Sequence, residues 1–162
     1  MPARINPMTA SRESIQAMFD FQQKVNNSGL EPRLLHLVSM LVSRINGCAY
    51  CIDMHGKDLR AEGETELRID LVSVWEEVDV YTEREQAAFA WADAVTRVSE
   101  THVPDGVYAR AREQFSEEEL VKLTLAVVAI NGWNRLMISF RGEPGNYKPG
   151  MYAQKIPELQ ER

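Results

Sequence analysis

The chain has 162 residues, of which 44% are hydrophobic and 26% are charged. These fractions are typical of folded proteins and exclude a disordered or low-complexity chain, and the length fits one domain with a sizeable core. There are 18 Lys and Arg against 24 Asp and Glu, giving a net charge of -6. Proteins that bind nucleic acid or anionic membranes normally carry a basic excess, so we expect neither as a partner.

No apolar stretch of the kind found in signal peptides occurs in the first 20 residues. The longest apolar run, residues 125–130, is far shorter than the roughly 20 residues that a membrane span needs. The sequence therefore predicts a soluble, cytoplasmic protein. Its two cysteines, Cys48 and Cys51, lie three residues apart, and the lack of a secretory signal argues against a structural disulfide framework.

Helical periodicity runs through most of the chain, interrupted by Asn-Gly and Gly signals. Successive helices are expected over residues 15–25, 34–45, 48–62, 64–74, 82–98, from 104 onward and from 116 onward. Thr82 and Ser116 each begin a capping box. No alternating pattern indicates a strand. We predict a single all-α domain over residues 1–162, with about six to eight helices, a core of about 12–141 and an irregular tail over 142–162.

The chemistry is expected in the segment that contains Cys48, Cys51 and His55. If a helix begins at about Cys48, the two cysteines share a face and are close enough to form a disulfide. His55 then lies one turn beyond Cys51. A helix N-terminus favours a thiolate, and a nearby histidine can accept the thiol proton. Peroxidases and thiol–disulfide enzymes need this combination of a reactive thiolate and a resolving thiol.

Two other interpretations of the cysteine pair are open. The cysteines could be unrelated core residues. Alternatively His36, Cys48, Cys51 and His55 could bind zinc if the helix of residues 34–45 folds back antiparallel. Zinc-binding cysteines usually occupy a tight turn, and a domain of this size needs no metal for stability. We therefore assign no metal and no cofactor.

Three segments resemble one known family: SRINGCAYCIDMH at 43–55, YTEREQAAFAW at 81–91 and INGWNRL at 130–136. They are similar to the alkylhydroperoxidase D-like members of the carboxymuconolactone decarboxylase family, over roughly residues 12–141. The resemblance implies an all-helical fold and homo-oligomers such as trimers or hexamers. It also implies peroxidase activity in which Cys51 attacks the hydroperoxide, Cys48 resolves the product and His55 relays protons.

Two positions depart from the family pattern. His36 stands twelve residues before Cys48, where the family commonly has a relay Glu, and Tyr50 replaces a His between the cysteines. A histidine can relay a proton, but it supplies no fixed negative charge to support a protonated His55. We expect His36 to take part in the relay. Cys48, in the first turn, is expected to be better placed than Cys51 to meet an outside reductant.

The predicted function is cysteine-dependent reduction of hydroperoxides, an antioxidant activity that cycles Cys48 and Cys51 between dithiol and disulfide. The partners would be a hydroperoxide and an unidentified thiol reductant. One alternative is a thiol–disulfide module or redox sensor without peroxidase activity. Less favoured are a zinc-binding structural protein and a lactone decarboxylase relative, since the cysteine pair is not the working feature of the decarboxylases.

Overall fold

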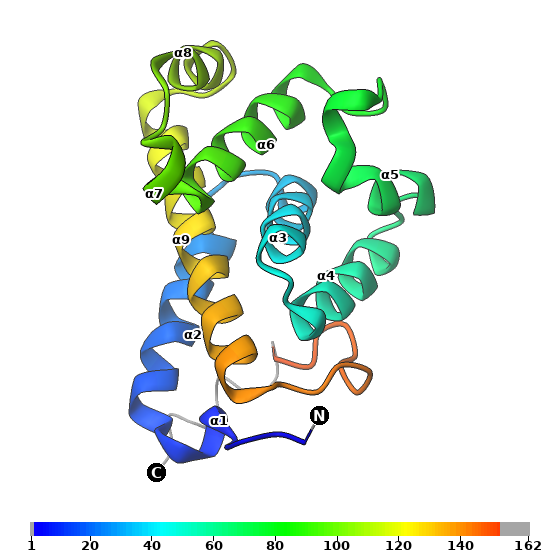
Figure 1. Cartoon of the computed structure of the whole chain (residues 1–162), viewed down its shortest axis with the longest axis vertical. Coiled ribbons are helices and arrows are strands. Elements are labelled where there is room, and N and C mark those ends of the chain that lie inside the picture. Colours follow the sequence, from blue (N-terminus) through cyan, green and yellow to red (C-terminus); the bar gives the residue numbers. More distant parts are fainter. Residues whose placement is uncertain (1, 153–162) are drawn as a thin grey trace.

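The computed structural model describes residues 2–152, and over that range the chain consists of helices and their connections, with no strand (Figure 1). Within it, nine α-helices and one 3-10 helix follow one another: α1 (Pro7–Ala10), α2 (Arg12–Asn26), α3 (Pro32–Asn46), α4 (Ala49–Ala61), α5 (Glu66–Leu71), η1 (Val72–Glu77), α6 (Glu83–Thr96), α7 (Val98–Thr101), α8 (Asp105–Gln114) and α9 (Glu117–Phe140). The all-α prediction is confirmed. There are more α-helices than the expected six to eight because α1 and α7 are single turns of four residues.

Two predicted helices are divided in the structure. The one over residues 82–98 ends at Thr96, and Val98 begins the separate turn α7. The pattern over residues 64–74 forms α5 and then η1, in which Val74 leaves the helical region with φ -125° and ψ 30°. The tail expected from residue 142 has turns and bends but no helix as far as 152. Residues 153–162 lie outside the described range. The boundaries of a single domain over 1–162 stay a prediction.

Helix α3 occupies the centre of the fold, where it packs against α4, α6 and α9 (Figure 1). Its Leu37, Val38 and Val42 are fully buried. Burying side chains of this size stabilises a fold by roughly 1.5–3 kcal/mol each. Because α3 is apolar on two faces, it can serve as a common support for α4 on one side and for α9 on the other.

The turn between α3 and α4 is fixed by Gly47 and Asn46. Gly47 adopts the left-handed conformation (φ 70°), which a glycine accepts without steric cost and which ends α3. The side-chain amide of Asn46 donates hydrogen bonds to the Oδ1 atoms of Asn131 (3.0 Å) and Asn134 (2.9 Å) on α9. These contacts hold the beginning of α4, and with it the first cysteine, against the longest helix.

By length and composition alone, α9 is the one helix among residues 2–152 that could cross a membrane. Core helices of soluble proteins share these properties, and α9 packs along α2, α3 and α6. Its Leu123 and Val127 are fully buried in the core. On another face Val121, Leu125 and Val128 are exposed, at spacings of four and three residues. We call these three residues the α9 stripe. Because α9 packs against other helices and is partly buried in the core, it does not indicate a membrane protein.

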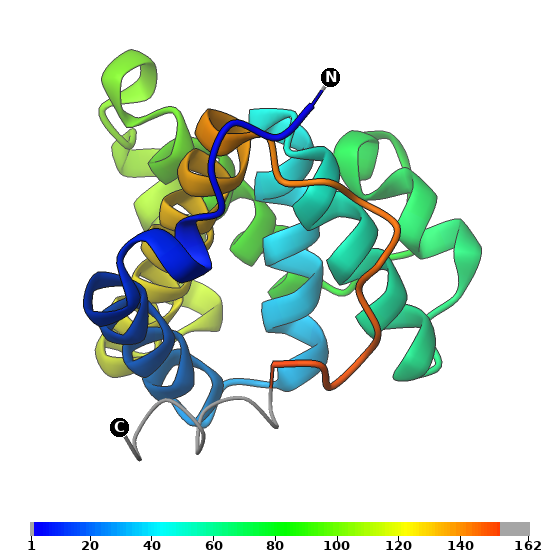
Figure 2. The same cartoon turned by 90° about the horizontal axis from the view of Figure 1, so that it is seen from below.

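The segment after α9 returns across α4, as the orange-to-red trace of Figure 2 shows. The backbone N–H of Gly145 donates to Asp53 Oδ2 (2.9 Å), and Lys57 Nζ donates to the Gly145 carbonyl (3.0 Å). Tyr147 is buried, and its hydroxyl donates to Asp58 Oδ1 (2.8 Å). This C-terminal segment therefore forms part of the wall around the outer face of α4.

Candidate active site

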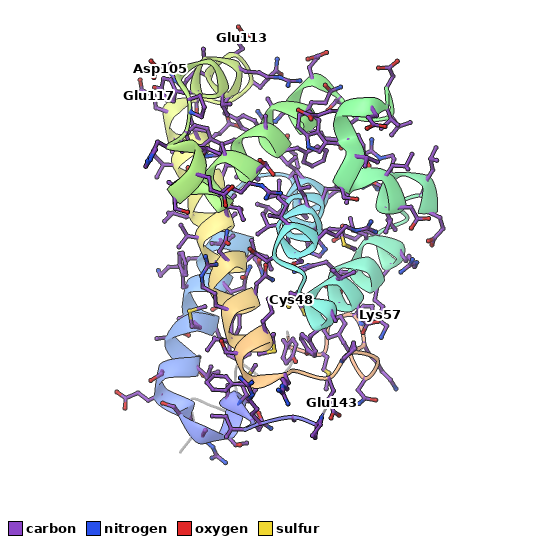
Figure 3. The ribbon with its side chains drawn as sticks, viewed as in Figure 1. Cys48, Lys57, Asp105, Glu113, Glu117 and Glu143 are labelled. Atoms are coloured by element: carbon purple, nitrogen blue, oxygen red, sulfur yellow. A yellow bond between two sulfur atoms is a disulfide. The ribbon has the colours of Figure 1, made fainter. Side chains whose placement is uncertain are left out.

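Cys48 and Cys51 lie at the start of α4, where Cys48 is the N-cap residue (Figure 3). The backbone N–H of Cys51 points to Cys48 Sγ at 3.4 Å, in the position that a serine hydroxyl occupies at many helix starts. The two sulfurs are bonded in a disulfide, with the Cα atoms 5.4 Å apart. The sequence placed the pair one turn apart at a helix start, and the structure places them there.

Cys51 borders a cavity of about 470 Å³, and Cys48 is not among the residues that line it. His36, His55 and Asp58 line the same cavity from α3 and α4. The remaining wall is mostly apolar and aromatic, from α2, α4, α9 and the C-terminal segment, and includes Phe19, Tyr50, Met54, Trp133, Tyr147 and Tyr152. A small molecule in the cavity can therefore approach one sulfur of the pair and not the other.

Both cysteines are 1% exposed. Our expectation that Cys48 would be the more accessible to a reductant is therefore not met in this structure. The N-cap position turns its sulfur back toward the amide of Cys51, because that sulfur satisfies a backbone donor which the first turn leaves unpaired. Of the two cysteines, Cys51 is the one that borders the cavity.

His55 is buried, with 9% of its surface exposed, and its two ring nitrogens have no hydrogen-bond partner within residues 2–152. Its ring centroid lies 5.9 Å from that of His36 in an edge-on arrangement. Burial, with a smaller contribution from His36, lowers the pKa of His55 to about 3. In the disulfide form His55 is therefore a neutral imidazole at neutral pH.

This burial predicts an acid-sensitive fold. An unfolded His55 gains a proton near pH 6.5, whereas the folded one does so only near pH 3, so the free energy of unfolding falls as pH drops through this window. Between pH 7 and pH 5 the free energy of unfolding should fall by about 2 kcal/mol more in the oxidised wild type than in the oxidised His55→Gln variant. Urea denaturation at the two pH values measures the difference. The exposed His102, changed to Gln, is the control; equal losses in the wild type and His55→Gln would contradict the assignment.

Asp58 lies with His36 and His55 in a polar cluster, and the sequence analysis did not name it as a site residue. One ligand atom from each of His36, His55 and Asp58 lies within 4.8 Å of the other two. Burial raises the pKa of Asp58, opposed by the hydrogen bond from Tyr147. The signal was present in the sequence, since residues 51, 55 and 58 are spaced by four and three and share one helix face.

Tyr50 takes the place between the cysteines, and its hydroxyl is hydrogen-bonded to that of Tyr152. Burial, together with this hydrogen bond, raises the pKa of Tyr50 well above its usual range. The rings of Tyr147 and Tyr152 stack with centroids 5.7 Å apart, and Phe19 lies against both Tyr152 and Trp133. Tyr50 is therefore a neutral part of the cavity wall rather than a proton carrier at neutral pH.

The structure thus brings together His36, Cys51 and His55 at one cavity and leaves Cys48 bonded behind Cys51. Chemically, the arrangement offers a two-electron dithiol–disulfide pair, a neutral imidazole that can take up a proton, and an apolar space for an organic molecule. In this disulfide form the two sulfurs are bonded to one another, so neither is a thiolate that could bind zinc.

Comparisons with known proteins show the family to which the chain belongs. The chain matches the model of the carboxymuconolactone decarboxylase family over residues 12–94, half of its length. It is 37% identical over 139 residues to the uncharacterized protein YdfG of Bacillus subtilis, covering 86% of this chain and 95% of that protein.

Solved structures give the same result. A protein of unknown function from Agrobacterium tumefaciens, named as a candidate AhpD antioxidant defence protein, is 46% identical with a TM-score of 0.88, and the match covers 90% of this chain and 100% of that one. A peroxidase-related protein from Ralstonia eutropha, with an alkylhydroperoxidase AhpD core, shares the fold at 21% identity and a TM-score of 0.76, over 86% of this chain and 74% of that one. The chain therefore belongs to the carboxymuconolactone decarboxylase family, as an alkylhydroperoxidase D-like member.

Proposed function

We propose that the protein is a peroxidase that reduces organic hydroperoxides with the Cys48–Cys51 pair and needs no prosthetic group. The observation that carries this proposal is the single cavity that contains Cys51, His55 and His36 behind an apolar wall. An apolar cavity of this size suits the carbon skeleton of an alkyl or aryl hydroperoxide. We expect such substrates to be reduced faster than hydrogen peroxide, which has no carbon skeleton to contact the apolar wall.

In the first step, His55 takes the thiol proton of Cys51, and the thiolate attacks the outer oxygen of the hydroperoxide. A sulfur–oxygen bond forms while the oxygen–oxygen bond breaks. The alkoxide leaves and takes the proton back from His55 to become the alcohol. Cys51 is then a sulfenic acid, and the hydroperoxide has accepted two electrons.

In the second step, the Cys48 thiolate attacks the sulfur of the Cys51 sulfenic acid. The sulfur–sulfur bond forms, the sulfur–oxygen bond breaks, and the hydroxide leaves as water after taking up a proton. The amide of Cys51, which points to Cys48 Sγ in the disulfide, would also stabilise the Cys48 thiolate. An unidentified external thiol or dithiol then returns two electrons and regenerates the pair.

Asp58 provides the negative charge that a histidine at position 36 cannot. Its carboxylate lies beside both His36 and His55, from the next turn of α4. A protonated His55 is attracted to this carboxylate as well as to the Cys51 thiolate. We infer that His36 and Asp58 together replace the single glutamate that is common in the family relay, with Tyr147 orienting Asp58.

Peroxide turnover separates this proposal from the alternative of a redox module without peroxidase activity. Reduced protein is mixed with cumene hydroperoxide, with a dithiol such as dihydrolipoamide as electron donor, and the alcohol product is measured. Steady production of one alcohol per dithiol oxidised supports the peroxidase. Disulfide exchange with the donor, without alcohol formation above the protein-free rate, would contradict it.

We also propose that the protein forms a homo-oligomer, a trimer or hexamer, through the α9 stripe, and acts in the cytoplasm. Val121 and Val128 are 61% and 50% exposed, and burying such side chains against a second copy is favourable. Light scattering at micromolar concentration should give a multiple of 18.4 kDa. Val121→Glu combined with Val128→Glu should give a single chain, while Leu67→Glu, at an exposed site on α5, should not. A wild-type mass of 18.4 kDa would contradict assembly.

A further inference from the structure

Two imidazoles and a carboxylate converge at the cavity from α3 and α4. We propose that His36, His55 and Asp58 form a binding site for a divalent first-row transition ion of the Zn²⁺ type. One possible ligand atom from each residue lies within 4.8 Å of the other two. Two histidines and one carboxylate form a donor set that such ions bind, with further positions left for water.

The first independent observation is the state of His55. It is nine-tenths buried and lines the cavity, and neither of its ring nitrogens has a hydrogen-bond partner among the described residues. Buried polar atoms in folded proteins are nearly always satisfied, so two unpaired nitrogens on one side chain need a partner. A metal ion would supply a partner for one of them, and a neutral imidazole is the form that binds metals.

The second observation is the set of groups behind the two other donors. His36 Nδ1 lies 3.7 Å from Glu62 Oε1, and Tyr147 donates a 2.8 Å hydrogen bond to Asp58 Oδ1. In metal sites, a ligating histidine commonly presents its second nitrogen to a carboxylate, which fixes the ring and leaves the other nitrogen for the ion. The buried Nδ1 of His36 has no hydrogen-bond partner among the described residues, so Glu62 would have to move closer to hold the ring and leave Nε2 for the metal. Tyr147 already leaves Oδ2 of Asp58 for the ion.

The distances are compatible with an ion after a small closure. A tetrahedral Zn²⁺ with ligands at about 2.1 Å needs its donor atoms about 3.4 Å apart. Because the donor atoms lie within 4.8 Å of one another, the side chains must close by at most about 1.4 Å, and no hydrogen bond restrains the ring of His55. The adjoining cavity has room for a water as fourth ligand. Imidazole donors favour transition ions over Mg²⁺ and Ca²⁺, which prefer oxygen.

This site uses neither sulfur, so it is distinct from a zinc site built on the cysteine pair. It does share His55 with the relay of the proposed peroxidase. Because a nitrogen that holds the ion cannot take the Cys51 proton, metal binding and hydroperoxide reduction should exclude one another. That consequence rests on the proposed function, whereas binding of the ion does not.

The test uses the full chain with Cys48→Ser and Cys51→Ser together, which removes both thiols and any peroxidase activity. Co²⁺ is added as a spectroscopic probe and Zn²⁺ in calorimetry, and the melting temperature is recorded with and without Zn²⁺. In this background His36→Gln and Asp58→Asn each remove one ligand. His102→Gln removes the exposed third histidine and is the matched control.

We expect one ion per chain, visible cobalt absorption bands of a site with nitrogen ligands, and a higher melting temperature with Zn²⁺. Loss of a residue that supports a metal ligand typically weakens binding by roughly 10–100-fold. His36→Gln and Asp58→Asn each remove a ligand itself, so they should weaken Zn²⁺ binding by at least this factor, whereas His102→Gln should leave it unchanged. The proposal is overturned if the cysteine-free protein binds no ion while the reduced wild type does, or if all variants bind alike. Variants that keep the melting temperature of the metal-free parent show that lost binding is not lost folding.

Discussion

Cys51→Ser is expected to stop hydroperoxide reduction, while Cys48→Ser should still carry out a single turnover. An alcohol at position 51 gives almost no nucleophile at neutral pH, so the rate should fall by more than about three orders of magnitude. Cys48→Ser keeps the sulfur that borders the cavity and should consume about one equivalent of hydroperoxide. It should then stop as a sulfenic acid at Cys51, which dimedone traps and mass spectrometry locates.

The opposite order of roles has a physical case, because Cys48 is the N-cap residue and its sulfur lies nearest the amides of α4. The two mutants decide between the orders. A dimedone adduct on Cys48 in Cys51→Ser, with none on Cys51 in Cys48→Ser, would show that Cys48 attacks the hydroperoxide. Thiol counts on both denatured variants before the reaction confirm that each retains one free cysteine.

His55→Ala is expected to keep both thiols and to react with hydroperoxide more slowly by a factor on the order of 10² to 10⁴, the contribution of a positioned general base. Stopped-flow measurement of thiol loss in reduced protein gives the rate. Added imidazole can enter the space left in the cavity and should restore part of the lost rate. A purely structural role of His55 would not produce this effect. His102→Ala serves as the control for loss of a histidine elsewhere.

A His55→Ala rate within threefold of the wild type would remove His55 from the proton relay. Asp58→Asn refines the result, because it keeps the size of the side chain and removes its charge. We expect Asp58→Asn to slow thiol oxidation less than His55→Ala does, since Asp58 acts through His55. A larger effect of Asp58→Asn would mean that the carboxylate itself takes the proton.

The helices could be predicted because their signals are local. The capping boxes of Thr82 with Glu85 and of Ser116 with Glu119 are both formed, and α6 and α9 begin directly after them. Gly47 ends α3 as expected. The start of α4 differs by one residue from the prediction because Cys48 caps the helix rather than joining it. The break at Val74 carries no glycine or proline signal, so no local pattern indicates it.

The site could be predicted only in part. Cys48, Cys51 and His55 share one helix, so their proximity follows from helical spacing. The meeting of His36 with His55 depends on how α3 and α4 pack, and the antiparallel arrangement made it foreseeable. Tyr147, in contrast, reaches Asp58 across 89 positions of sequence, through a segment rich in glycine and proline. No local pattern indicates where such a segment folds back.

The most direct test of the account is the mass of the reduced wild-type protein before and after one equivalent of cumene hydroperoxide. We predict the loss of two hydrogens from the chain, a disulfide joining Cys48 to Cys51, and one equivalent of the alcohol. The mass should return on addition of a dithiol. A chain that keeps both free thiols while hydroperoxide remains in solution would contradict the proposed peroxidase.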